Sequence, residues 1–251
     1  MRYLFILLFS LSIYASDNLD LGLPSKVGQV IDRKGYAFCY SEKYEQPLWV
    51  SYKLTQAEAL SKVAKRKNNF KADKVITTGS ASLSDYRRSG FDRGHLAPAA
   101  DMAWSKDSMS ESFFMTNMSP QVPGFNRGIW KKLESLVRNW STIDKELYII
   151  TGPIITPSFQ TIGKDKVAIP QYYYKIAVDL KGPQVKAIAF ILPNKASKKP
   201  LSDFVVSINR VEEVTGLDFL TNLSPSLEEA LEKEQDLSLW NFKAKVNRQS
   251  I

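Results

Sequence analysis

The sequence predicts an α+β fold in which a mixed, largely antiparallel β-sheet is flanked by helices. Short aromatic and β-branched runs bounded by turn residues recur along the chain, which is typical of strands. Residues 171–178 and 185–192 form two such runs around a Lys-Gly-Pro turn, like an antiparallel pair. Residues 125–140 instead repeat their apolar side chains at helical spacing. These periodicities together predict the α+β class.

The first sixteen residues have the pattern of a secretory signal peptide. Arg2 supplies a positive start, residues 3–13 are mostly apolar, and Ala15 and Ser16 offer a small-residue cleavage point. The apolar run is too short for a membrane span. We therefore expect residues 1–16 to be removed and the protein to be periplasmic or secreted, with no stable membrane span after cleavage. The bulky Tyr14 leaves retention as an anchor open.

Residues 17–251 are long enough for one domain with a full core, and no internal repeat or second domain boundary interrupts them. The formal net charge of +8 suggests an anionic partner such as nucleic acid, lipid headgroups or polysaccharide. Cys39 is the only cysteine, which excludes an internal disulfide.

The first part of this domain reads as strands followed by a helix. Strands are predicted over 26–31, 36–40 and 48–52. Thr55 and Glu58 then form a capping box ahead of apolar residues at helical spacing. The helix ends in a basic cluster, Lys65-Arg66-Lys67, which is either a solvated helix end or a phosphate-facing group.

The middle of the chain is predicted to change from loop to helix. Residues 71–90 are polar and irregular, 113–117 is a predicted strand, and 119–124, with two prolines and a glycine, is a predicted loop. The amphipathic stripe of the following helix consists of Ile129, Trp130, Leu133, Leu136, Val137 and Trp140.

Two features of this predicted helix have ordinary explanations. Asn126 stands in the first turn, where asparagine is a good helix cap. Glu134 and Arg138 are four residues apart and suit a surface ion pair.

The remainder is predicted to be a strand over 146–151, the antiparallel pair, helices over 201–214 and 227–239, and a basic tail in the last ten residues.

His95 is the only histidine in the sequence. Histidine is the only side chain that titrates near neutral pH without perturbation, so His95 is the natural candidate for a general base. An acid, a cation and a glycine precede it in Asp92-Arg93-Gly94-His95, and a stretch about thirty residues on offers amides and a carboxylate. This setting favours a catalytic histidine over a merely packed one.

Three stretches together resemble the non-specific DNA/RNA endonucleases of the ββα-metal class, which include secreted bacterial nucleases and mitochondrial endonuclease G. The first, residues 85–96, contains the Asp-Arg-Gly-His signature. The second is 116–121 followed by Phe125-Asn126, Trp130, Leu133 and Glu134. The third is softer and comprises 151–154, 191–194 and 215–219. The resemblance covers residues 66–219 and implies a β-hairpin followed by a helix at the metal site.

The resemblance also implies roles for individual residues. His95 would be the general base and Asn126 the sole direct protein ligand of a Mg²⁺ ion, for which Mn²⁺ can substitute. Asp92 and Glu134 would accept hydrogen bonds from metal-bound waters. Arg93 would support the site, and Asn117 would be a polar partner near the histidine.

Phosphate contacts are implied for three arginines. Arg66 matches the phosphate-facing arginine of the family, although Lys65 or Lys67 could serve instead. Arg87 and Arg88 lie in a loop that suits an anion site. Arg88 stands where related sequences commonly carry a small residue, and it either adds a phosphate contact or simply faces solvent. Gln121 has either a site role or a role in shaping its loop.

This residue set suits phosphodiester hydrolysis. A base must deprotonate an in-line water, and a metal ion must neutralise the charge that grows on the phosphate and the leaving oxygen. Mg²⁺ needs few protein ligands, so one asparagine is sufficient when phosphate completes the shell. The expected enzyme is a secreted, Mg²⁺-dependent endonuclease that cleaves DNA and RNA with little sequence preference.

Other functions remain open at the level of sequence. The chain could be a basic surface protein that binds nucleic acid or another polyanion without cleaving it. It could also be a narrower phosphodiesterase, or a toxin-like nuclease held by an immunity partner. Besides DNA and RNA, the partners left open are a second copy in a homodimer and an inhibitor protein.

Overall fold

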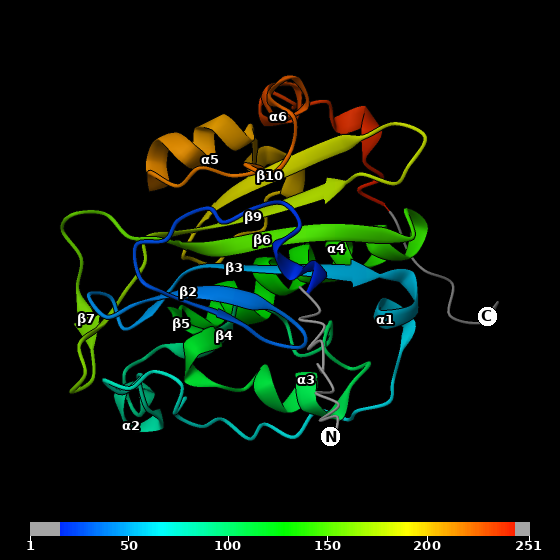
Figure 1. The fold of residues 1–251 in the computed structure, drawn as a ribbon. Helices are drawn as coiled ribbons and strands as arrows, with labels where there is room; N and C mark the ends of the chain where they lie inside the picture. The colour runs from blue at the N-terminus through cyan, green and yellow to red at the C-terminus, as the bar shows by residue number, and fades with distance from the viewer. Residues whose placement is uncertain (1–15, 244–251) are drawn as a thin grey trace, which may run out of the picture.

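A computed structural model describes residues 16–243. Its centre is a seven-stranded sheet in the order β1-β2-β3-β6-β9-β10-β11, in which every neighbouring pair is antiparallel (Figure 1). The strands are β1 (Gln29–Asp32), β2 (Ala37–Ser41), β3 (Gln46–Thr55), β6 (Glu146–Ile154), β9 (Tyr172–Asp179), β10 (Lys186–Pro193) and β11 (Val205–Val206). The predicted α+β class and the antiparallel pair of β9 and β10 are confirmed.

Both faces of the sheet are covered. The helices α5 (Ile208–Thr215) and α6 (Pro225–Glu232) lie over one face, together with the short N-terminal turn Asp17–Leu19. Over the other lie α4 (Lys131–Ile143), α3 (Lys106–Glu111) and the hairpin of β4 (Asp92–His95) and β5 (Met118–Gln121) (Figure 1).

Alternate residues of one strand therefore enter different cores, as the two-residue period of a strand requires. In β2, Phe38 joins the core under α4 and Cys39 joins the core under α5 and α6. Cys39 is completely buried, and burial raises the pKa of its thiol to about 11.

The remaining elements are short. The capping box of Thr55 and Glu58 is confirmed, and it starts α1 (Gln56–Leu60), which is shorter than the predicted helix. The segment before β4 contains the short helix α2 (Leu83–Tyr86). The loop after β6 contains a small antiparallel pair, β7 (Thr161–Ile162) and β8 (Val167–Ala168).

The region before the long helix differs from its prediction. Residues 113–117 do not form a strand; Met115–Asn117 is a 3-10 turn, and the strand is β5, within the segment predicted to be a loop. Pro120 lies inside β5 opposite Arg93 of β4. A two-stranded pair has free outer edges, so a proline without an N–H group is tolerated there.

The predicted helix over 125–140 is confirmed in position but is not uniform. Phe125–Trp130 is a π-helical turn, and the regular helix α4 follows it. Gly128, inside this turn, has non-helical backbone angles of φ −103° and ψ −110°. Asn126 therefore lies on a wide, irregular turn, and it does not cap α4.

The C-terminal helices are also shorter than predicted. The segment 201–214 divides into the 3-10 turn Leu201–Phe204, strand β11 and helix α5. Helix α6 ends at Glu232, and the 3-10 turn Leu237–Leu239 follows it.

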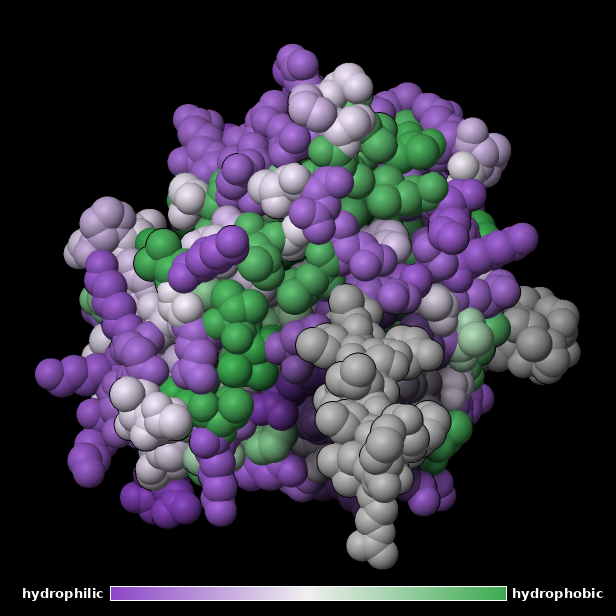
Figure 2. Space-filling view, in the orientation of Figure 1, coloured by the Kyte–Doolittle hydropathy of each residue, from purple (hydrophilic) through white to green (hydrophobic). Residues whose placement is uncertain are grey.

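The predicted signal peptide lies almost wholly outside the described residues, as does most of the basic tail. Within residues 16–243, every helix is too short or too polar to cross a bilayer. Hydrophobic residues still reach the surface in patches between hydrophilic ones on the face drawn in Figure 2.

Candidate active site

The candidate site is built on the β4–β5 hairpin and the turn that follows it. Gly94 pairs with Ser119 and His95 with Met118, so the signature stretch lies flat against the second motif stretch. A Cβ atom on Gly94 would lie 2.2 Å from the side chain of Gln121. Only glycine fits here, and the buried Gln121 side chain shapes the hairpin by packing on it.

His95 lies at the end of β4 in an aromatic slot. Its ring contacts Phe70 and Phe113 edge-on, with centroid distances of 5.6 and 4.9 Å. The ring nitrogen Nε2 is buried, and no described residue makes a hydrogen bond to it. Burial first, and then the charges of Arg66 and Arg93, lower the pKa of His95 to about 3. The imidazole is therefore neutral at pH 7.

Asn117 holds the chain that follows His95. Its amide oxygen accepts a hydrogen bond from the Ala97 N–H at 2.9 Å, and its amide nitrogen donates to the carbonyls of Ala97 and Ser112, both at 2.9 Å. The side chain is completely buried. Asn117 thus lies against the chain that directly follows His95, and its side chain makes these hydrogen bonds to backbone groups.

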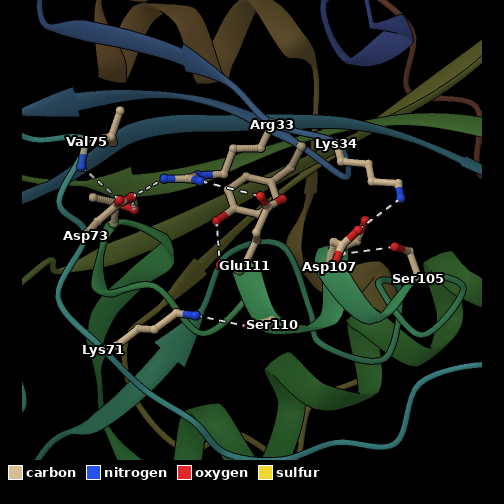
Figure 3. A network of polar contacts seen from close by, with 12 residues as sticks. Arg33, Lys34, Lys71, Asp73, Val75, Ser105, Asp107, Ser110 and Glu111 are labelled. Atoms are coloured by element: carbon tan, nitrogen blue, oxygen red, sulfur yellow. Dashed lines mark hydrogen bonds and ion pairs between the residues drawn. The ribbon is translucent and has the colours of Figure 1, made fainter.

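A polar network anchors the segments around the hairpin (Figure 3). Arg33 donates to the buried Asp73 at 2.6 Å and lies 3.6 Å from Glu111 of α3. Asp73 also accepts from the Thr116 hydroxyl at 2.6 Å, directly before Asn117. These contacts tie the irregular segment around Asp73 to the sheet and to the start of β5.

Asp92, Asn126 and Arg127 meet at the other end of β4. Asn126 Nδ2 donates to Asp92 Oδ2 at 2.8 Å, and Arg127 donates to both oxygens at 2.8 and 2.6 Å. Burial alone would raise the pKa of Asp92, but the hydrogen bonds from Arg127 and Asn126 and the charges of Arg127 and Arg93 lower it. Asp92 is therefore ionised at neutral pH.

These residues border a cavity of about 710 Å³. Of the predicted site residues, its lining includes Arg66, Arg87, Asp92, Arg93 and Asn126. The Arg66 and Arg93 guanidinium groups lie over the rings of Phe113 and Phe70, at 5.1 and 4.2 Å from the centroids. The same two rings that hold His95 thus carry the cations beside it.

Four predicted residues do not line this cavity, namely His95, Asn117, Glu134 and Arg88. Arg88 is exposed, in a left-handed backbone conformation with φ +58°, and the geometry gives it no part in the cavity. His95 borders the cavity indirectly, through Phe70 and Arg93.

Glu134 lies in the first turn of α4 within a group of charges beneath the site. Burial raises its pKa, while the nearby charges of Lys175 and Arg138 lower it in part. Lys175 of β9 is buried, with Nζ 5.0 Å from the Trp130 ring centroid, and burial lowers its pKa. The surface pair of Arg138 with Glu134 is not formed, because Arg138 pairs with the buried Asp101.

The residues present fit a divalent cation at Asn126. The hydrogen bond from Asn126 Nδ2 to Asp92 holds the amide nitrogen against the carboxylate. The amide oxygen Oδ1 then points away from Asp92 and is a hard oxygen ligand for a cation. Within the described residues, the one cluster of three acidic groups (Glu212, Asp218 and Glu232) lies with α5 and α6, across the sheet from His95. That cluster does not contribute to this site.

A sequence profile of the DNA/RNA non-specific endonucleases matches residues 15–226. The chain belongs to the DNA/RNA non-specific endonuclease family. Members of this family are metal-dependent nucleases, so the protein is an endonuclease that acts on nucleic acid.

Relatives of this endonuclease occur in several kinds of organism. It is 34% identical over 249 residues to the mitochondrial nuclease of Saccharomyces cerevisiae, covering 90% of this chain and 75% of that one. It is 33% identical over 216 residues to mitochondrial endonuclease G of Homo sapiens, covering 80% and 72%. It is also 33% identical over 249 residues to a nuclease of Nostoc sp., covering 91% and 89%.

A solved structure has the same fold as this endonuclease. It is the crystal structure of a complex of EndoG with EndoGI, which describes the mechanism of EndoG inhibition. The two chains superpose with a TM-score of 0.78 and 32% sequence identity, over 82% of this chain and 91% of that one.

Sequence reasoning missed several residues of the endonuclease site. Arg127 follows Asn126 directly, but no spacing rule links it to Asp92, 35 residues earlier. Phe70 and Phe113 read as ordinary core aromatics. Lys175 lies between Tyr174 and Ile176 in its strand, and no sequence pattern there indicates that its charge is buried.

Proposed function

We propose that the protein is a Mg²⁺-dependent endonuclease that hydrolyses phosphodiester bonds of DNA and RNA alike, with His95 as the general base and Asn126 as the direct metal ligand. The observation that carries this proposal is the hydrogen bond from Asn126 to Asp92 at the edge of a cavity lined by four arginines (Arg66, Arg87, Arg93 and Arg127). This hydrogen bond leaves the amide oxygen of Asn126 for a cation, beside the arginines that we expect to bind phosphate.

His95 takes the proton of the attacking water. Because Nε2 is buried, Nδ1 is the ring nitrogen left for this transfer. The phenylalanine slot keeps the ring neutral and oriented before substrate arrives. A phosphate bound between Arg66 and Arg93 offsets the two charges that lower the pKa of His95, so substrate binding makes the histidine a stronger base.

With a metal ion at Asn126, Asp92 and, from beneath the cavity, Glu134 would accept hydrogen bonds from its waters, and the cavity arginines would neutralise the phosphate. When bound at Asn126, Mg²⁺ supplies a positive charge that stabilises the phosphate and the leaving oxygen. Mn²⁺ is proposed as a substitute, because it also accepts oxygen ligands.

The residues that line the cavity are poorly suited to distinguish one nucleotide base from another. Arginines recognise phosphate oxygens, which DNA and RNA share, and such contacts position the strand without identifying bases. We therefore propose cleavage of both nucleic acids, and activity that falls as salt screens the phosphate contacts.

We further propose export of the protein, supported by Arg2 and the apolar run over 3–13. N-terminal sequencing of the protein recovered from cell fractions tests this, and the sequence should begin near Asp17. An intact Met1 on the isolated protein would contradict cleavage.

The deciding experiment incubates purified protein with supercoiled plasmid and with total RNA, in Mg²⁺ or EDTA, beside the variant His95→Ala. We expect metal-dependent loss of both substrates in the wild type, and kcat lower by roughly 10²–10⁴-fold in the variant. If both proteins only shift DNA on a gel, the chain is a binding protein. If RNA survives while plasmid is cut, the proposed lack of sugar preference is wrong.

A further inference from the structure

A second basic groove runs along α4 beside the catalytic cavity. This α4 groove has a volume of about 750 Å³, and both it and the cavity are lined by Arg127. Its other cations are Lys131 and Lys132 on α4 and Lys198 and Lys199 on the loop before Leu201. The two spaces are therefore adjacent, with Arg127 at the boundary.

The charges of this groove are unbalanced. The four lysines are exposed, and within the described residues none of them has an acidic partner within ion-pair distance. No aspartate or glutamate lines the groove. A solvated helix face commonly interleaves both signs, as Glu229 of α6 and Lys233 at its C-terminal end do. A groove of one sign concentrates field and attracts a polyanion.

The dimensions suit a nucleic-acid strand. The helix face from Lys131 to Asn139 spans about 12 Å at 1.5 Å per residue. One strand of a duplex advances about 3.4 Å per phosphate, so this length serves roughly three phosphates. Leu201 and the half-buried Phe242 also line the groove, and the ring centroids of Phe242 and Trp140 lie 5.5 Å apart. An apolar floor of this kind accepts sugars and base faces of any sequence.

We propose that the substrate strand leaves the catalytic cavity past Arg127 and lies in the α4 groove, where Lys131, Lys132, Lys198 and Lys199 bind the phosphates next to the scissile one. This inference rests on the proposed nuclease function and adds to it the path of the strand. It makes the enzyme prefer substrates that extend several nucleotides beyond the cut.

The test compares two variants that each lose four positive charges. The first carries K131Q, K132Q, K198Q and K199Q; the control carries K26Q, K43Q, K74Q and K181Q, which are exposed positions that line neither the cavity nor the groove. Cleavage of a 30-nucleotide single strand and of a dinucleotide is measured from 50 to 300 mM NaCl.

We expect the groove variant to lose at least tenfold in the ratio of kcat/KM for the 30-mer to that for the dinucleotide, and the control to keep the wild-type ratio. The slope of log(kcat/KM) for the 30-mer against log[NaCl] should become shallower by about 0.7 for each phosphate that the variant no longer binds. Equal ratios and slopes in the two variants would overturn the proposed path. Absence of all cleavage in the wild type would instead refute the nuclease function.

A second measurement does not depend on variants. The wild-type protein is treated in EDTA with an amine-reactive reagent, with and without a 30-mer, and modified lysines are identified by mass spectrometry. The four groove lysines should be protected at least threefold and the four control lysines should not. Equal modification of the groove lysines with and without the 30-mer overturns the proposal even if the groove variant fails to fold.

Discussion

The carboxylate of Asp92 is held at both oxygens by the guanidinium of Arg127, with N–O distances of 2.6 and 2.8 Å. Such a two-point pair is geometrically specific. The Arg127 side chain is nevertheless 72% exposed. Because Arg127 also lines the cavity, we expect its guanidinium to contact a substrate phosphate.

Replacing Arg127 should therefore weaken substrate binding more than chemistry. For Arg127→Ala we expect KM for plasmid DNA to rise about tenfold, with a smaller change in kcat, because the variant lacks one phosphate-binding cation. Steady-state kinetics at constant salt measure both. Arg88→Ala is the matched control, since Arg88 is exposed and outside the cavity; an equal defect there would refute the assignment.

The single histidine permits a direct titration. With burial and two arginines lowering its pKa to about 3, the His95 ring should stay neutral from pH 8 down to about pH 4.5. The lone imidazole Cε1–H signal in proton NMR measures this without assignment. A midpoint near the ordinary 6.5 would show that the ring is solvated, contrary to the structure.

The same shift makes stability depend on pH. The unfolded chain protonates His95 near pH 6.5 and the folded chain only near 3, so the stabilising contribution is complete above 6.5 and is lost as pH falls toward 3. Between pH 7 and 5 this lowers the free energy of unfolding by about 2 kcal/mol. Urea denaturation of the wild type and of His95→Asn at both pH values isolates the contribution of His95. An equal decrease in the free energy of unfolding of both proteins would contradict this prediction.

Asn126 should control metal affinity. Asn126→Ala removes the amide oxygen, so the Mg²⁺ concentration for half-maximal cleavage should rise at least tenfold. Thermal unfolding without metal should change little, because Asn126 is half-buried and lies outside the regular part of α4. An unaltered Mg²⁺ requirement would remove Asn126 from the metal site.

Replacing Asn117 should lower the stability of the folded protein. Asn117→Ala leaves three buried backbone groups of Ala97 and Ser112 without their partners, which should lower the free energy of unfolding by about 3 kcal/mol. Asn69→Ala, which removes one exposed hydrogen bond to Ser110, is the control and should cost less than about 0.5 kcal/mol. Comparable losses in urea denaturation would show that Asn117 has no special role.

The parts of the fold found from the sequence are those fixed by local pattern. Apolar and aromatic alternation located the strand pair of β9 and β10, and the stripe from Ile129 to Trp140 located the long helix. Strand β5 was missed because Pro120 argues against a strand unless the sheet edge is known. Nothing in the sequence around Gly128 indicates that its backbone leaves the helical conformation just before α4.

The site residues likewise divide into those that the local sequence predicts and those that it does not. The signature stretch placed Asp92, Arg93 and His95 together, because they are neighbours in the chain. The Arg138–Asp101 pair and the position of Lys175 beside Trp130 depend on how distant segments pack, so no local spacing predicts them. The hydrogen bonds of Asn117 also depend on packing, since its partners are backbone groups 20 and 5 residues away in the chain.

The completely buried Cys39 has a consequence for where such an enzyme can work. Its thiol cannot pair within the chain, and its raised pKa keeps it from becoming a reactive thiolate at neutral pH. Oxidants and glutathione alike meet a folded chain that offers them no exposed sulfhydryl. The covalent structure is therefore the same in an oxidising and in a reducing compartment, and the fold needs no redox maturation in either.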